Sequence, residues 1–60
     1  MADFYIRKSD NNQYYFYLRA ENNEVVATSE MYTTVASAKN GIASVKKNAP
    51  IAGIIDASNE

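Results

Sequence analysis

The chain has 60 residues, a formal net charge of −1, and neither cysteine nor histidine. Without cysteine it has no disulfide and no thiolate nucleophile. Without histidine it lacks the commonest metal ligand and the usual general base near neutral pH. The composition therefore predicts no catalytic, cofactor-binding or metal-binding residues.

A chain of this length forms one domain, which we place at residues 1–56, followed by a disordered tail at residues 57–60. Folding at this size buries only about 60% of the surface that the unfolded chain exposes, so such a domain is marginally stable alone. Disulfides, metals and partner subunits are the usual additions. Since the composition removes the first and disfavours the second, we expect a homodimer.

Residues 1–20 lack the uninterrupted apolar run of a signal peptide or a membrane span. We therefore expect a cytoplasmic protein with no membrane partner. Lysine and arginine are scattered along the chain, so its overall charge gives no electrostatic footprint for nucleic acid.

Three segments alternate apolar and polar residues or are rich in strand formers: residues 4–7, 13–20 and 24–28. Residues 9–12, Ser-Asp-Asn-Asn, are typical of a turn, and Asn22-Asn23 is typical of a two-residue hairpin. The sequence therefore predicts a three-stranded antiparallel meander.

A helix is predicted to begin after Tyr32, with Thr33 or Thr34 as its N-cap. Apolar residues then recur three and four positions apart, at Val35, Ala38, Ile42, Val45 and Ala49. Pro50 ends the helix, because proline cannot continue it.

Gly41 lies inside this helix, where glycine costs about 1 kcal/mol relative to alanine. Asn40-Gly41 is a hairpin signal by itself, but the flanking residues have helical spacing. Close approach of the helix to the sheet or to a partner helix would explain the glycine, so we count Gly41 as a candidate dimer contact.

Residues 51–56 are short, apolar and rich in isoleucine, which predicts a fourth strand. The segment must bury its apolar side chains, and a chain this short has little spare core. We expect it to pair with the sheet edge of a second subunit. Its candidate dimer contacts are Ile51, Ile54 and Ile55.

Alternation places tyrosines and arginines on the sheet face opposite the helix, at Tyr5, Arg7, Tyr15, Tyr17 and Arg19. Aromatic residues interleaved with arginine can bind single-stranded nucleic acid. We favour the simpler interpretation, that tyrosine is a good strand former or that this face meets the dimer mate, because the protein is net acidic and has no ribonucleoprotein motif.

Acidic residues stand in turns and at strand ends without metal-loop spacing, at Asp3, Asp10, Glu21, Glu24 and Glu30. We interpret them as a solvated rim. Ser29 and Ser37 have no histidine partner, which argues against a nucleophilic serine.

Several motifs in order resemble the YegP-like family of small bacterial proteins: Q-Y-Y-F-Y-L-R-A at residues 13–20, N-E-V-V-A-T-S-E-M-Y at 23–32, and S-A-K-N-G-I-A-S-V-K-K-N at 37–48. The resemblance implies a unit of three strands, a helix and a strand, present as a tandem pair or as a single copy. It implies that single copies form homodimers by exchanging their C-terminal strands. It supplies no activity and no catalytic residues.

The sequence thus predicts an α+β fold, a three-stranded meander, one helix and a short C-terminal strand (β3-α-β), swapped in a homodimer. We expect a non-enzymatic binding or interaction module whose partner includes itself. The alternative is single-stranded nucleic-acid binding through the tyrosine and arginine residues. An enzyme acting on a small ligand is a third alternative that no residue pattern favours.

Overall fold

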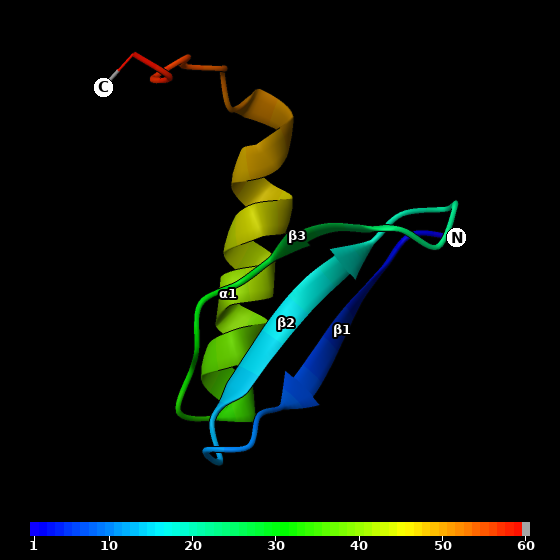
Figure 1. The fold of residues 1–60 in the computed structure, drawn as a ribbon, viewed down its shortest axis with the longest axis vertical. Coiled ribbons are helices and arrows are strands. Elements are labelled where there is room, and N and C mark those ends of the chain that lie inside the picture. Colours follow the sequence, from blue (N-terminus) through cyan, green and yellow to red (C-terminus); the bar gives the residue numbers. More distant parts are fainter. Residues whose placement is uncertain (60) are drawn as a thin grey trace.

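The computed structural model describes residues 1–59. Its elements in chain order are β1 (Asp3–Lys8), β2 (Tyr14–Arg19), β3 (Val25–Thr28), α1 (Val35–Asn48) and the short 3₁₀ helix η1 (Ala49–Ile51). The strands form one antiparallel sheet in the order β1-β2-β3, and α1 packs on one face of it against β2 and β1 (Figure 1). The predicted α+β fold of three antiparallel strands and one helix is confirmed.

The two strand connections share one design. Backbone hydrogen bonds close residues 9–13 and residues 20–24 in the same pattern, so each loop contains three residues. Asn12 and Asn23 take the same last place in their loops, with φ values of 63° and 67°. Asparagine tolerates this left-handed backbone. The prediction of a two-residue turn at residues 22–23 is therefore wrong by one residue, because Asn23 closes a three-residue loop with a left-handed last residue.

The helix begins where the sequence predicts, and Thr34 rather than Thr33 is its cap. Thr34 has extended backbone (φ −138°, ψ 159°), and its Oγ1 accepts a hydrogen bond from the Ser37 backbone N–H at 3.0 Å. This bond satisfies one of the amides that the first helical turn leaves without a partner. At the other end, α1 ends at Asn48, and Pro50 is the second residue of η1, which continues the helix by one tight turn.

The core lies between β2 and α1 and centres on Phe16, which is 7% exposed. The Phe16 ring stacks on Tyr32 and meets Phe4 edge-on, with 5.9 Å between ring centroids in both pairs. From the helix, Ala38 is fully buried. Most of the remaining apolar side chains stay partly exposed, so this core is small even for a short chain.

Gly41 allows the helix to lie against that aromatic cluster. A Cβ atom at this position would lie 2.8 Å from Tyr32 Cζ and 3.0 Å from Phe16 Cε2, and closer still to the Tyr32 hydroxyl oxygen. Real Cβ atoms do not approach neighbours so closely, so the chain's own rings account for the glycine. A contact between Gly41 and a partner helix stays a prediction.

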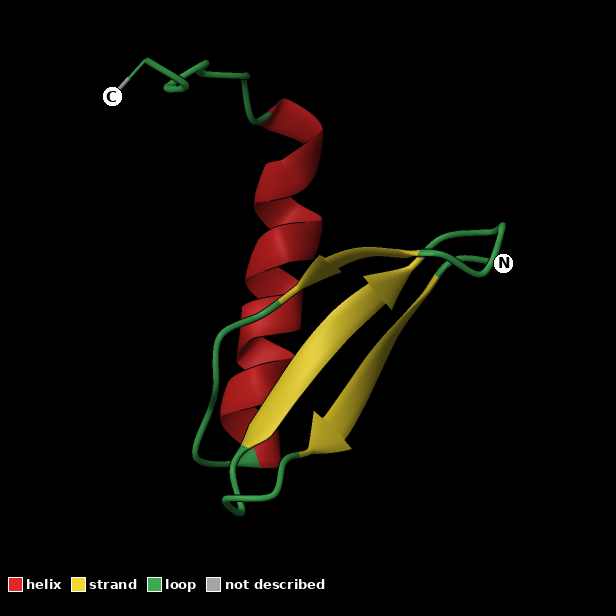
Figure 2. Ribbon diagram, viewed as in Figure 1, coloured by secondary structure: helices red, strands yellow, loops and turns green. Residues whose placement is uncertain are grey.

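The predicted fourth strand does not form within the chain. Ile51 belongs to η1, and residues 52–57 have no regular structure, although Ala52 has extended backbone (φ −72°, ψ 133°). The segment leaves the far end of α1 and points away from the sheet, as the loop at the chain end in Figure 2 shows. A strand needs an edge to pair with, and this segment reaches none in its own chain. Its exchange with a second subunit stays a prediction.

The predicted disordered tail, residues 57–60, falls partly outside the described residues, because Glu60 is not among them. Within the described part, the Ser58 backbone N–H donates to Asp56 Oδ1 at 3.0 Å. Hydrogen bonding to the Ser58 side chain, and to a smaller extent to its backbone N–H, lowers the pKa of the Asp56 carboxyl. Disorder of the tail stays a prediction.

Replacing Gly41 by alanine is expected to destabilise the fold. Alanine gains about 1 kcal/mol of helix propensity, whereas forcing a methyl group against two rings costs about 1–3 kcal/mol. Urea unfolding at one fixed protein concentration should show a net loss. Gly53→Ala is the matched control, because a Cβ atom at Gly53 meets nothing within 4 Å. A Gly41→Ala protein as stable as the wild type would contradict this packing.

Removing the Thr34 hydroxyl is expected to destabilise the helix. Thr34→Ala should lower the free energy of unfolding by about 1 kcal/mol, the typical cost of losing an N-cap. Thr33→Ala serves as the control, since Thr34 is the residue whose side chain caps α1. Equal effects of the two substitutions in the same urea titration would show that the cap bond contributes nothing.

Candidate functional site

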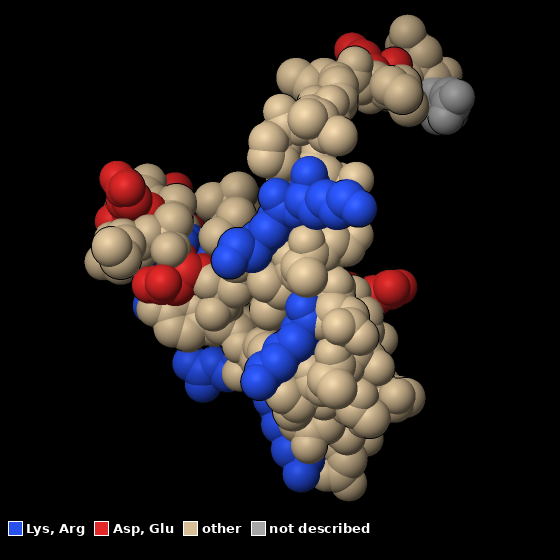
Figure 3. Space-filling view, turned by 180° about the vertical axis from the view of Figure 1, so that it is seen from behind, with Lys and Arg blue, Asp and Glu red and all other residues tan. Residues whose placement is uncertain are grey.

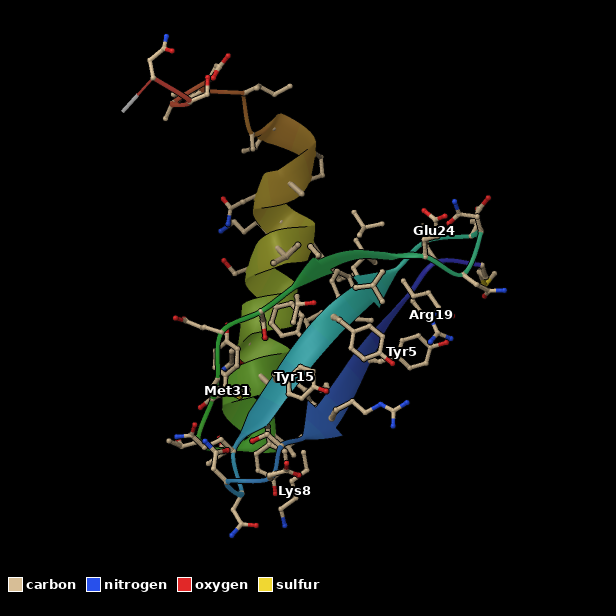
Figure 4. The ribbon with its side chains drawn as sticks, viewed as in Figure 1. Tyr5, Lys8, Tyr15, Arg19, Glu24 and Met31 are labelled. Atoms are coloured by element: carbon tan, nitrogen blue, oxygen red, sulfur yellow. The ribbon has the colours of Figure 1, made fainter. Side chains whose placement is uncertain are left out.

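The five tyrosine and arginine residues singled out from the sequence do share one surface. In the β1–β2 register Tyr5 lies opposite Tyr17 and Arg7 lies opposite Tyr15, and directly opposed residues point to the same side of a sheet. Figure 4 shows Tyr5, Tyr15 and Arg19 on the side of the strands away from α1. We call this surface the tyrosine–arginine face; it consists of Tyr5, Arg7, Tyr15, Tyr17 and Arg19.

Two tyrosine rings and one arginine of this face pack against one another. Tyr5 and Tyr17 stack on each other with 5.2 Å between centroids and 17° between planes, and Tyr17 is only 8% exposed. The Arg19 guanidinium lies over both rings, 5.1 Å from the Tyr5 centroid and 5.9 Å from that of Tyr17. Cation–π contact of this kind holds an arginine in place at little entropic cost. The face is therefore ordered before any partner arrives.

Arg7 lies at the other end of the face and is fully solvated. Hydrogen bonding to the Tyr17 side chain, together with the nearby tyrosine oxygens, raises the pKa of its guanidinium above the ordinary value. Arg7 therefore stays positively charged at every physiological pH. The tyrosine–arginine face thus presents two fixed cations and several hydroxyl groups.

The four lysines belong to other surfaces. Lys39, Lys46 and Lys47 are exposed on α1, and Lys8 ends β1. In Figure 3, which views the molecule from the helix side, most Lys and Arg side chains lie along the middle of the visible surface. The Asp and Glu side chains lie at its margins. We interpret the lysines as solvated charges.

The serines considered as nucleophiles have structural roles instead. Ser29 Oγ accepts from the Phe16 backbone N–H at 2.9 Å and donates to the Glu30 carbonyl oxygen at 2.7 Å. Ser37 belongs to the helix cap, where its Oγ accepts from Thr34 Oγ1 at 3.0 Å. Both hydroxyls therefore hold backbone in place.

Among residues 1–59 there is no enclosed pocket and no group of three acidic, histidine or cysteine side chains that could hold a metal ion. The same residues include no helix long and apolar enough to cross a membrane. Any functional site in this part of the chain is therefore an open surface.

A second surface was missed from the sequence, namely the outer side of β3. All four β3 residues are exposed, including Val25 and Val26, and Met31 just beyond the strand is exposed as well. The predicted contacts Ile51, Ile54 and Ile55 are also almost completely exposed. The available signal was that Val25–Thr28, V-V-A-T, carries no charge at all.

The chain is similar in sequence to a domain family and to several curated bacterial proteins. The profile of a domain of unknown function, DUF1508, matches residues 9–56. UPF0339 protein YegP from Yersinia pestis is 50% identical over 50 residues, and a UPF0339 protein from Bordetella pertussis is 52% identical over 50 residues. Each match covers 83% of this chain and 45% of the relative. The chain thus spans about half the length of these curated relatives.

Two solved structures share the fold over nearly their whole length. The NMR solution structure of a protein from Haloferax volcanii is 37% identical, with a TM-score of 0.86, and the match covers 93% of this chain and 95% of that one. The solution NMR structure of protein ATU0232 from Agrobacterium tumefaciens is 34% identical, with a TM-score of 0.83, and the match covers 98% of this chain and 95% of that one.

The profile match, the identity to the curated relatives and the shared fold all agree with the motifs in the strands and helix. The chain belongs to the YegP-like (UPF0339) family, whose domain is described as one of unknown function.

Proposed function

We propose that this chain is a non-enzymatic interaction module that forms a homodimer by exchanging its C-terminal segment, residues 51–56. The observation that carries the proposal is the exposure of three isoleucines in one short stretch. Ile51 is 82% exposed, Ile54 98% and Ile55 91%. Burying an isoleucine side chain stabilises a protein by about 1.5–3 kcal/mol. A partner that covers these three side chains would therefore be bound favourably.

The hydrophobic core of the molecule is small compared with this exposed apolar surface. Phe16, Tyr17 and Ala38 are its buried hydrophobic residues. A domain this small is marginal when alone. Association that covers the isoleucines would add apolar burial to this small core.

The edge that best fits the incoming segment is β3. β1 and β3 each pair only with β2 in the sheet of residues 1–59, so each has an outer edge without ladder bonds. β1 carries Asp3, Arg7 and Lys8, and charges on an edge strand discourage pairing. β3 has no charge, and its exposed Val25 and Val26 would meet apolar residues. We therefore place residues 51–56 of one subunit against β3 of the other.

The relatives support a two-unit assembly. The matched stretch is 45% of each curated relative, which leaves room for a second unit of similar size. A tandem pair, which the family resemblance implies, would bring two such units together within one chain. In our proposal a second copy of this chain supplies the second unit.

The case against catalysis rests on the chemistry of the side chains. The sequence contains no histidine or cysteine, and the carboxylates of residues 1–30 stand at turns and strand ends. General acid–base and nucleophilic catalysis need such groups to converge on one point. An open, ordered surface serves binding better than it serves chemistry.

Truncation after Asn48 is expected to abolish the folded dimer. Because the chain then loses the residues that cross to the partner, it should unfold or aggregate. Size-exclusion chromatography with light scattering and circular dichroism would detect this.

Ile54→Asp in the full chain should weaken dimerisation about thirtyfold or more, the cost of losing an interface hot spot.

Ser58→Ala is the matched control, because it changes an exposed residue beyond the segment. A truncated chain that stays a folded, soluble dimer would contradict the proposal. So would an Ile54→Asp protein that dimerises as tightly as the wild type.

A further inference from the structure

Arg19 has a hydrogen-bonding group without a partner. Its Nε atom is buried and makes no hydrogen bond among residues 1–59, although a buried N–H is normally paired. Asp3 lies directly opposite Arg19 in the register and could have supplied a carboxylate. The guanidinium instead lies across Tyr5 and Tyr17. The Arg19 side chain is thus held in place by rings and lacks an anion.

Arg7 provides a second guanidinium at the other end of the face, and it is exposed to solvent. The Tyr17 side chain raises the pKa of its guanidinium, and no carboxylate is among the groups that shift this pKa. Two guanidinium groups therefore flank the Tyr5–Tyr17 stack, and both have donors to offer. An arginine fork matches a carboxylate in two parallel hydrogen bonds.

The orientation of the rings decides which anion fits. Binding of single-stranded nucleic acid relies on bases stacking on open aromatic faces. Here Tyr5 and Tyr17 cover each other, Arg19 lies over both, and Tyr15 is tilted toward Tyr17 at 6.4 Å. Tyr17 is 8% exposed and Tyr5 37% exposed, so the stacked pair offers little open ring surface to a base. Such a surface favours hydrogen-bond acceptors over stacking bases.

We infer that the tyrosine–arginine face is a docking surface for a segment of a partner protein that carries carboxylates. Tyrosine and arginine are the residues that most often dominate protein interfaces. Because the side chains are already held by stacking, binding loses little side-chain entropy. The face borders β3, because Tyr17 pairs with Thr28 and Arg19 pairs with Val25. None of its five residues is among the proposed dimer contacts, so the two surfaces adjoin without sharing a residue.

The direct test is a titration of ¹⁵N-labelled full-length protein with a short oligoglutamate peptide at physiological ionic strength. The Arg19 Nε–H signal reports on the unpaired group itself, since an incoming carboxylate should shift it. We expect saturable shifts of this signal and of the Tyr5 and Tyr17 amides. An oligothymidylate of similar charge should bind less tightly.

Paired variants separate a site from general attraction. Arg7→Gln with Arg19→Gln should weaken peptide binding about tenfold or more, because charge-assisted hydrogen bonds are lost. Lys39→Gln with Lys47→Gln removes the same charge from the helix and should change the affinity less than about twofold. If the arginine variant fails to fold, the titration of the wild-type protein still shows whether the peptide binds at Arg19.

Four results would overturn the inference: no saturable shift, shifts confined to the α1 lysines, tighter binding of oligothymidylate at this face, or dissociation of a dimer by the peptide. The last would mean that the face is itself the dimer contact. A monomeric protein that still binds the peptide here would remove the proposed dimer and leave this inference standing.

Discussion

The fold depends on how closely α1 can approach Phe16. That ring, on the central strand, touches Phe4 on one side and Tyr32 on another, and Gly41 leaves the helix room to come down on the pair. Ala38, one turn earlier, is fully buried by the same approach. With so few buried residues, a shift of this contact would loosen the whole core, since close-packed interiors lose energy over small gaps.

Local signals in the sequence were enough to predict most of the architecture. Alternation along residues 14–19 fixed β2 and its two faces, and the threonine cap and apolar stripe placed α1 within a residue or two. The loop at residues 20–24 was predicted one residue too short, because dipeptide composition cannot tell a two-residue turn from a three-residue turn that ends in a left-handed asparagine. Local patterns fix elements better than they fix the geometry between them.

The features that the sequence could not predict depend on contacts distant along the chain. Gly41 was correctly expected to have a packing reason, but only the structure identifies Tyr32 and Phe16 as that reason. Membership of the tyrosine–arginine face followed from alternation, whereas the Tyr5–Tyr17 stack beneath Arg19 depends on register. Residues 51–56 were predicted to form a strand because their composition suits one, yet strand structure requires an edge that this chain does not bring to them.

Two open surfaces therefore divide the interactions of a molecule with no enclosed pocket among its described residues. The uncharged β3 edge and the exposed isoleucines suit a second copy, while the tyrosine–arginine face suits an acidic partner. The most direct test of the dimer is an isotope-filtered NOE experiment on a mixture of ¹³C-labelled and unlabelled chains. Our account predicts NOEs between the methyl groups of Ile54 or Ile55 in one subunit and Val25 or Val26 in the other. Intermolecular NOEs that run only to β1, or none at all, would contradict it.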